Sequence, residues 1–264
     1  MNVLRLMKRL SRRRPAPLLA ANRLLTSPSI RRIAHSLGFL PEDFESVHCI
    51  GDSHLRYFDW VARHALWLNT RYEIFMVPGA TAMGMANPNS RTNALQSFSE
   101  YLAARKPVET VLTMLGEVDC GFVIWYRADK YGESPDSQLE RSFFNYTEFL
   151  DNISALYGCR IIVSSIPLPT IIDGQDWGEV ANLRKEVTAS LRERTDLTIR
   201  YNDMLSEFCT QRGYEFLDFT SPTLDPETGV ISQTFLENDP LDHHLSSKAI
   251  APLIVERLRN LGFS

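Results

Sequence analysis

Five short apolar runs, each followed by a longer amphipathic stretch, set the pattern of the chain after residue 45. The runs are rich in Val, Ile and Phe and are bounded by polar or turn-forming residues, which is typical of parallel strands buried on both faces. They cover residues 46–52, 72–78, 110–115, 160–166 and 215–219. We therefore expect a central parallel sheet of about five strands.

Between these runs, apolar residues recur at the spacing of helices with one buried face each. The pattern predicts helices over 55–68, 92–105, 137–157, 178–192, 199–212 and 246–261. Because crossover connections between parallel strands are right-handed, the alternation predicts an α/β fold, a three-layer α/β/α sandwich. Composition does not change after residue 45, so we expect a basic N-terminal arm over 1–45 and one domain over 46–264.

The charge of the chain is unevenly distributed, although its net value is only −4. Nine of the 28 basic residues precede the first acidic residue, Glu42, which leaves 19 basic against 32 acidic residues, a charge of −13, in the rest. Such an acidic body does not favour specific binding of nucleic acid. In the arm, Leu4, Leu6, Met7 and Leu10 alternate with cations, which fits either a solvated segment or an amphipathic helix on an anionic membrane surface.

The four cysteines, Cys49, Cys120, Cys159 and Cys209, have no paired spacing. This favours reduced thiols over a disulfide framework or a zinc site. No segment is long enough to span a bilayer. We therefore expect a cytoplasmic protein without a cofactor, peripheral at the inner face of the membrane if the arm binds lipid. Cys120 is a conceivable nucleophile after the third strand, but a structural thiol is favoured there.

The candidate chemistry begins at Gly51–His54, a Gly-Asp-Ser-His tetrapeptide at the end of the first apolar run. It places the hydroxyl of Ser53 at the end of a buried strand, where open α/β sheets bind their ligands. A serine becomes a strong nucleophile when a histidine takes its proton and a carboxylate orients that histidine. The alternative is a turn in which Asp52 or Ser53 caps the next helix.

The base and its carboxylate have candidates near the C-terminus, in residues 239–246. We expect His244 to be the base and Asp242 the carboxylate that orients it. His243 and Asp239 are the competing residues, and a pair of adjacent histidines can also lie in a solvated loop.

Four segments resemble, in the same order, the motif blocks of the SGNH, or GDSL-like, hydrolase superfamily. They are Gly51–Ser53, Val77–Gly84, Leu115–Asp119 and His244–Ser246. The resemblance implies the flavodoxin-like SGNH hydrolase fold, with Ser53 as nucleophile and His244 as base. It also implies that backbone N–H groups bind the oxyanion, and the residues that it places in that part of the site are Gly79, Gly116, Glu117 and Asp119.

The third block departs from the family, because Val118 stands where the family has an asparagine that donates to the oxyanion. Losing one such donor typically costs about a hundred- to a thousand-fold in turnover. The site is therefore either weakened or rebuilt with another donor. Glu117 could contribute if it is protonated, or if it holds a donor such as Arg127 in place.

The last block departs as well, because Leu241 stands three residues before His244, where the family has aspartate. The neighbouring carboxylates, Asp242 and Asp239, are the candidates for that role, with Asp242 preferred. For His54, beside the nucleophile, we expect polar packing towards the following helix rather than contact with substrate.

Together these features predict a serine esterase that acts on an O-acyl ester, and the resemblance implies an ester of a carbohydrate or lipid, with bacterial surface polysaccharide preferred. An O-acyltransferase would use the same acyl-enzyme. A non-catalytic carbohydrate-binding protein of the same fold is another alternative. Gly-Asp-Ser-His and Asp-His-His also contain ligand types of metal-dependent phosphoesterases, but the chain lacks a Gly-Asn-His-Glu block, so we expect no metal.

Overall fold

The computed structural model describes residues 45–65, 70–173, 187–239 and 242–263. Its central sheet has five parallel strands in the order β2-β1-β3-β4-β5. The strands are β1 (Glu45–Gly51), β2 (Thr70–Met76), β3 (Thr110–Met114), β4 (Arg160–Ser164) and β5 (Glu215–Leu217). This is the flavodoxin-like order, so the predicted α/β/α sandwich is confirmed, and each strand end lies within two residues of its predicted position.

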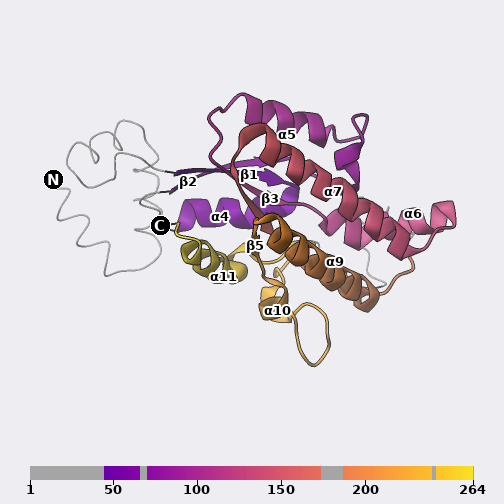
Figure 1. The fold of residues 1–264 in the computed structure, drawn as a ribbon. Helices are drawn as coiled ribbons and strands as arrows, with labels where there is room; N and C mark the ends of the chain where they lie inside the picture. The colour runs from indigo at the N-terminus through magenta and orange to yellow at the C-terminus, as the bar shows by residue number, and fades with distance from the viewer. Residues whose placement is uncertain (1–44, 66–69, 174–186, 240–241, 264) are drawn as a thin grey trace, which may run out of the picture.

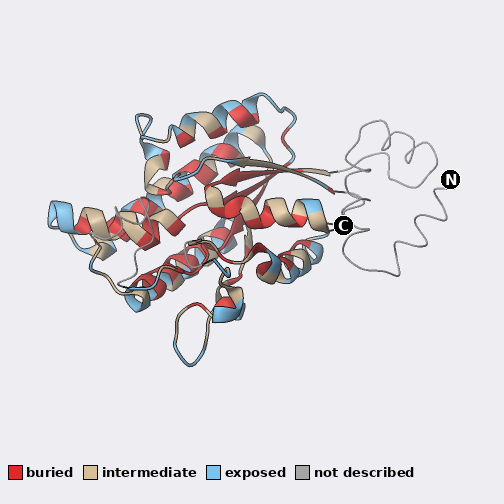
Figure 2. Ribbon diagram, turned by 180° about the vertical axis from the view of Figure 1, so that it is seen from behind, coloured by how far each residue is buried: buried red, intermediate tan, exposed pale blue. Residues whose placement is uncertain are grey.

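Helices cover both faces of the sheet (Figures 1 and 2). On one face, α4 (Arg56–His64) and α11 (Ser247–Asn260) pack against each other. The other face carries α5 (Ala94–Ala103), α6 (Ile124–Tyr131), α7 (Pro135–Tyr157) and α9 (Leu191–Arg212). The short helices are η1 (Ser53–Leu55), η2 (Met83–Ala86), η3 (Asp119–Val123), α10 (Thr220–Thr223) and η5 (Gln233–Phe235). Across the described ranges, no helix combines the length and the apolar character needed to cross a bilayer.

The two faces of the sheet bury separate apolar clusters, because successive strand residues point to opposite faces. In β3, Val111 packs into the cluster beneath α5, α7 and α9, whereas Leu112 packs into the cluster beneath α4 and α11. Both side chains are fully buried. Burial on both faces explains why the strands read as continuous apolar runs in the sequence.

The predicted helix over 178–192 is wrong over residues 187–190, which are not helical, and the predicted helix over 199–212 starts too late, because α9 begins at Leu191. A capping box fixes this start: the Ser190 hydroxyl accepts the N–H of Glu193 at 3.2 Å, and the Glu193 carboxylate accepts the N–H of Ser190 at 2.8 Å. Residues 1–44, which make up almost all of the expected arm, and residues 174–186 lie outside the described residues.

The segment that follows Val118 is helical. The π turn η3 continues into α6, which ends at Gly132 in the left-handed conformation with φ of 63°. Glycine is the usual residue at this position because it has no Cβ to clash there. The segment after β3 therefore continues as a helix beyond the carboxyl end of that strand.

The order in which the chain adds strands reverses at β1, because β2 lies on one side of β1 and β3 lies on the other. In open α/β sheets, ligands bind in the crevice outside the carboxyl ends of the strands at such a switch point. The Gly51–Ser53 and Leu115–Asp119 segments both leave the sheet there, at the ends of β1 and β3.

The end of β1 approaches β3 closely at Gly51. The N–H of Asp52 donates to the carbonyl of Met114 at 3.3 Å, and a Cβ at residue 51 would collide with the same carbonyl oxygen. A glycine is therefore required where the chain carries Ser53 across the end of β3.

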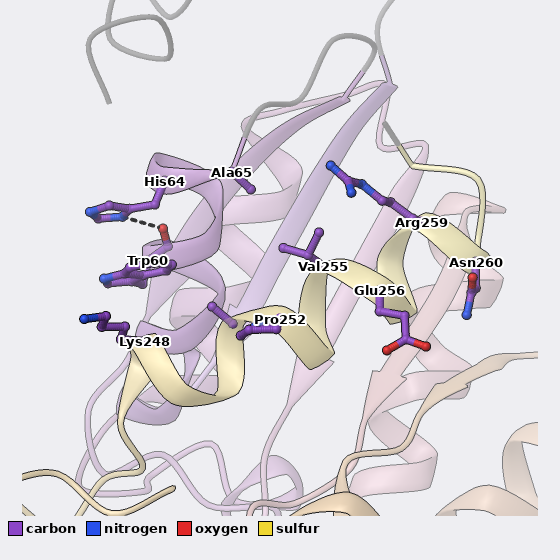
Figure 3. Close-up of a pocket in the computed structure, with 10 residues that line it drawn as sticks. Trp60, His64, Ala65, Lys248, Pro252, Val255, Glu256, Arg259 and Asn260 are labelled. Carbon is purple, nitrogen blue, oxygen red and sulfur yellow. Dashed lines mark hydrogen bonds between the residues drawn. The ribbon is translucent and has the colours of Figure 1, made fainter. Parts of the chain in front are cut away.

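A groove of about 560 Å³ lies between α4 and α11 (Figure 3). Trp60 and His64 line it with stacked rings whose centroids are 4.0 Å apart, and Lys248 lines it from α11. Among the described residues, its lining includes neither Ser53 nor His244. The groove is therefore a surface feature separate from the switch point.

Replacing Gly51 with alanine should destabilise the fold by about 3 kcal/mol, because the new Cβ forces β1 away from β3. Gly132→Ala is the matched control. A Cβ at Gly132 would meet no atom within 4 Å, so only the backbone at φ of +63° is strained, at about 1–2 kcal/mol. Urea unfolding followed by circular dichroism gives both free energies. Equal losses in the two variants would contradict the close approach at Gly51.

Candidate active site

Ser53 begins η1 directly after β1, in a turn that Asp52 caps. Asp52 has an extended backbone, and its Oδ1 accepts the N–H of His54 at 2.8 Å. This is the capping role considered from the sequence. The Ser53 hydroxyl is not used for capping in the described structure, and it lies 3.0 Å from Nε2 of His244.

Ser53, His244 and Asp242 form a continuous hydrogen-bonded chain. Nδ1 of His244 lies 2.7 Å from Oδ1 of Asp242, and the same oxygen accepts the backbone N–H of His244 at 3.0 Å. One nitrogen of the ring thus faces the serine and the other faces the carboxylate. This is the arrangement by which a histidine takes the proton of a serine while a carboxylate fixes its tautomer.

Arg56 holds the far side of the Asp242 carboxylate, and sequence reasoning missed it. Its Nη1 donates to Oδ2 of Asp242 at 2.8 Å, and its Nη2 lies 3.6 Å from Oε1 of Glu237. Burial acts to raise the pKa of Asp242, but the hydrogen bonds from His244 and Arg56 lower it to about 2. The carboxylate is therefore ionised at neutral pH. The spacing of Arg56, three residues after the serine in the first turn of a helix, was the available signal.

The imidazole of His244 is neutral at pH 7. Burial and the neighbouring rings of His54 and His243 lower its pKa to about 4, although Asp242 acts in the opposite direction. The ring of His243 packs at a centroid distance of 4.2 Å from that of His244. Asp239 contributes its carbonyl oxygen, which accepts the N–H of Asp242 at 3.0 Å. The carboxylate at His244 is thus that of Asp242, and Asp239 forms the turn before it.

Asp119 anchors the loop that carries Gly79. Its carboxylate accepts the N–H groups of Ala82 at 2.7 Å and Met83 at 2.8 Å, and the hydroxyl of Ser142 at 2.9 Å. Asp119 is fully buried, and burial raises its pKa to about 6 although these bonds act to lower it. Its contacts make it a support of the loop after β2.

Ser53 and Gly79 follow the carboxyl ends of β1 and β2. Within the described part of the chain, the N–H groups of Ser53 and Gly79 donate to no protein acceptor. Gly79 adopts φ of 74°, a conformation that favours glycine. Gly116 also has positive φ, at 122°, and a Cβ there would collide with Ile166. Gly116 therefore serves close packing between the ends of β3 and β4.

Glu117 pairs with His54, and this corrects the hypothesis that Glu117 holds Arg127. Oε2 of Glu117 lies 3.6 Å from Nε2 of His54. Nε of Arg127 instead donates to Gln138 at 2.8 Å, and its guanidinium lies over the ring of Tyr131. His54 is 2% exposed, so the expected polar packing is observed: its ring faces the carboxylates of Asp52 and Glu117 and also contacts the ring of Tyr57 in the following helix, α4.

The structure also shows the surroundings of the residues considered for a cysteine nucleophile and for a metal site. Cys120 is fully buried, and burial raises the pKa of its thiol, so it is unsuited to be a nucleophile. Ligand atoms of Asp242, His243 and His244 lie within 4.8 Å of one another, close enough to hold a metal ion. Both ring nitrogens of His244, however, already face Ser53 and Asp242. A metal ion there would have to displace one of those contacts.

Solved structures of esterases and lipases share this fold, whereas no protein-family model and no curated protein match the chain. A GDSL-like lipase from Bacteroides thetaiotaomicron is similar at 13% identity and a TM-score of 0.52, over 88% of this chain and 97% of that one. An acetylxylan esterase from Geobacillus stearothermophilus, in a catalytic mutant, is similar at 16% identity and a TM-score of 0.52, over 84% and 96%. A Bacteroides fragilis protein assigned as an acylhydrolase is similar at 12% identity and a TM-score of 0.54, over 88% and 96%.

At these identities the comparisons establish the fold of the chain, which is that of the SGNH and GDSL-like hydrolases. The resemblance drawn from four short blocks is thereby confirmed at the level of the fold.

Asp119→Ala should destabilise the protein by about 3 kcal/mol at pH 5, because it leaves the N–H groups of Ala82 and Met83 without an acceptor. A raised pKa means that Asp119 stabilises the folded state fully below about pH 4, and that this contribution falls as the pH rises through about 6. The loss should therefore be smaller at pH 7. Urea unfolding at both values measures it, with the exposed Asp129→Ala as control. Equal losses at the two values would contradict the raised pKa.

Proposed function

We propose that the protein is a serine esterase of the SGNH type that hydrolyses an O-acyl ester through Ser53, His244 and Asp242. The observation that carries the proposal is the unbroken chain of contacts of 3.0 Å and 2.7 Å from the serine hydroxyl through the imidazole to the carboxylate. This chain lies at the switch point of the sheet, where folds of this class bind their ligands. The esterases and lipases of the same fold support the reaction type.

In the proposed reaction, Nε2 of His244 takes the hydroxyl proton as Oγ of Ser53 attacks the ester carbonyl carbon. The N–H groups of Ser53 and Gly79 receive the oxyanion of the tetrahedral intermediate. His244 then gives the proton to the departing alcohol, which leaves an acyl-serine. A water molecule, deprotonated by the same ring, attacks the acyl carbon and releases the acid. Asp242 keeps the imidazole in the tautomer that these steps require.

The proposed substrate class is an acylated carbohydrate. The acetylxylan esterase of the same fold supports it, because that protein's substrate is a sugar ester. An acceptor hydroxyl of a sugar in place of water would turn the same acyl-enzyme into an O-acyltransferase. Product analysis with an acylated oligosaccharide, in the presence and absence of a second sugar, distinguishes free acid from transferred acyl group.

A fluorophosphonate probe tests the nucleophile directly. Wild-type protein should gain the mass of one adduct, and Ser53→Ala should gain none. His244→Ala should label at least about a thousand-fold more slowly, because the serine keeps its proton. His64→Ala, which removes a histidine of the α4–α11 groove, is the matched control and should label at the wild-type rate. A folded wild type that stays unlabelled, or an adduct on another residue, would refute the proposed site.

The rate of fluorophosphonate labelling should fall only at unusually acidic pH, where His244 becomes protonated. His244 acts as a base only when neutral, and its pKa of about 4 keeps it neutral well below the ordinary histidine range. The rate should therefore rise through about pH 4 and be level from pH 6 to 8. Rates are measured at pH values where near-ultraviolet circular dichroism shows the native fold. A limb centred near 6.5 would show that burial and the neighbouring rings do not lower this pKa.

A further inference from the structure

A second acid–histidine cluster lies directly behind the triad and joins the ends of β1 and β3. Nδ1 of His54 lies 3.0 Å from Oδ1 of Asp52, and Nε2 lies 3.6 Å from Oε2 of Glu117. The exposed fractions of Asp52, His54 and Glu117 are 1%, 2% and 3%. The proposed reaction gives none of these side chains a step.

The chemistry of the cluster sets the charge of His54. A neutral imidazole donates from one nitrogen only, whereas Nδ1 of His54 bonds the Asp52 carboxylate and Nε2 faces the Glu117 carboxylate at ion-pair distance, so the geometry favours a proton on both nitrogens. Two buried carboxylates also require a compensating charge nearby. An imidazolium at His54 meets both requirements.

The cluster contacts both the turn that carries Ser53 and the ring of His244. The backbone N–H and the ring of His54 both reach Oδ1 of Asp52, at 2.8 Å and 3.0 Å, so these bonds hold the turn that presents Ser53. The ring of His54 also packs against that of His244 at a centroid distance of 4.6 Å. The ring of His54 is thus held between two acids and supports the ring of the base.

The other groups that face His54 are consistent with this role. The ring of Tyr57 lies at a centroid distance of 6.0 Å and that of His243 at 6.2 Å. The Tyr57 hydroxyl accepts the N–H of Leu245 at 2.9 Å, which fixes the backbone after His244. The described groups around His54 thus include two acids, a phenol and the two histidines of the C-terminal block.

We propose that Asp52, His54 and Glu117 form a buried relay in which His54 is an imidazolium, and that Glu117 and His54 are positioning residues for Ser53 and His244. The inference rests on the proposed function, since it concerns the same nucleophile and base. In this proposal the Gly-Glu-Val-Asp segment contributes through Glu117, because the side chain of Val118 has no hydrogen-bond donor. Glu117 acts from the end of β3 through His54, rather than by donating to the substrate.

Nuclear magnetic resonance of isotopically labelled histidine nitrogens reads the charge of His54 without any substrate. At pH 7 the His54 ring, assigned by its loss in His54→Asn, should carry a proton on both nitrogens. Glu117→Gln keeps the shape of the side chain but removes its charge, and should leave one ring proton. Glu140→Gln, at an exposed position of α7, is the matched control and should leave the spectrum unchanged. A neutral His54 in the wild type would overturn the relay.

Fluorophosphonate labelling tests the positioning role in the same variants, once thermal unfolding shows that they are folded. Glu117→Gln and His54→Asn should each slow labelling by about 10- to 100-fold, the cost of a misplaced reacting group. The double variant should be no slower than the slower single variant, because the pair acts as one unit. A wild-type rate in Glu117→Gln, or losses that multiply, would overturn the positioning role. An unlabelled wild type would refute the esterase instead, and the charge of His54 would then decide the relay alone.

Discussion

The parallel pairing of β1 with β3 is the constraint on which the rest of the site depends. Gly51 is paired with Met114, and the next residue on the β1 side donates its N–H back to the Met114 carbonyl. Because of this register, the segment after β1 and the segment after β3 begin side by side at the same end of the sheet. Ser53 and Glu117 therefore leave the sheet at the same end of neighbouring strands, although they are far apart in the sequence. A shift of register by one residue would also exchange the buried faces of the strand.

The crevice gathers acidic groups, and each is stabilised by a different means. Asp242 is held by a guanidinium and an imidazole, and remains ionised. Asp119 is held by backbone N–H groups and a hydroxyl without a cation, and its pKa is raised. The acids beside His54 have an imidazole between them. His244 stays neutral beside the ionised Asp242 because burial and the neighbouring rings of His54 and His243 lower its pKa, and a neutral imidazole is the state a general base needs.

The sequence predicts the features that depend on local pattern and misses those that depend on tertiary contacts. Continuous apolar runs reveal the strands because both faces of the sheet are buried. Ser53, His244 and Asp242 could be named because the first ends a strand and the others sit in a short polar block. The predicted helix over 199–212 begins too late, because the Ser190 capping box, and not apolar periodicity, fixes the start of α9 at Leu191. The contact between His54 and Glu117 could not be foreseen, since it requires the register of β1 on β3.

The separation of nucleophile and base along the chain has a consequence for biosynthesis. Ser53 and His244 are 191 residues apart, and α11, which follows His244, buries Ile254 and Leu258 in the cluster beneath α4. A ribosome therefore synthesises the serine long before the histidine that the proposed mechanism requires. In that mechanism the serine hydroxyl stays unactivated until His244 has been made and α11 has packed beneath α4, so activation of the serine coincides with completion of the core on that face.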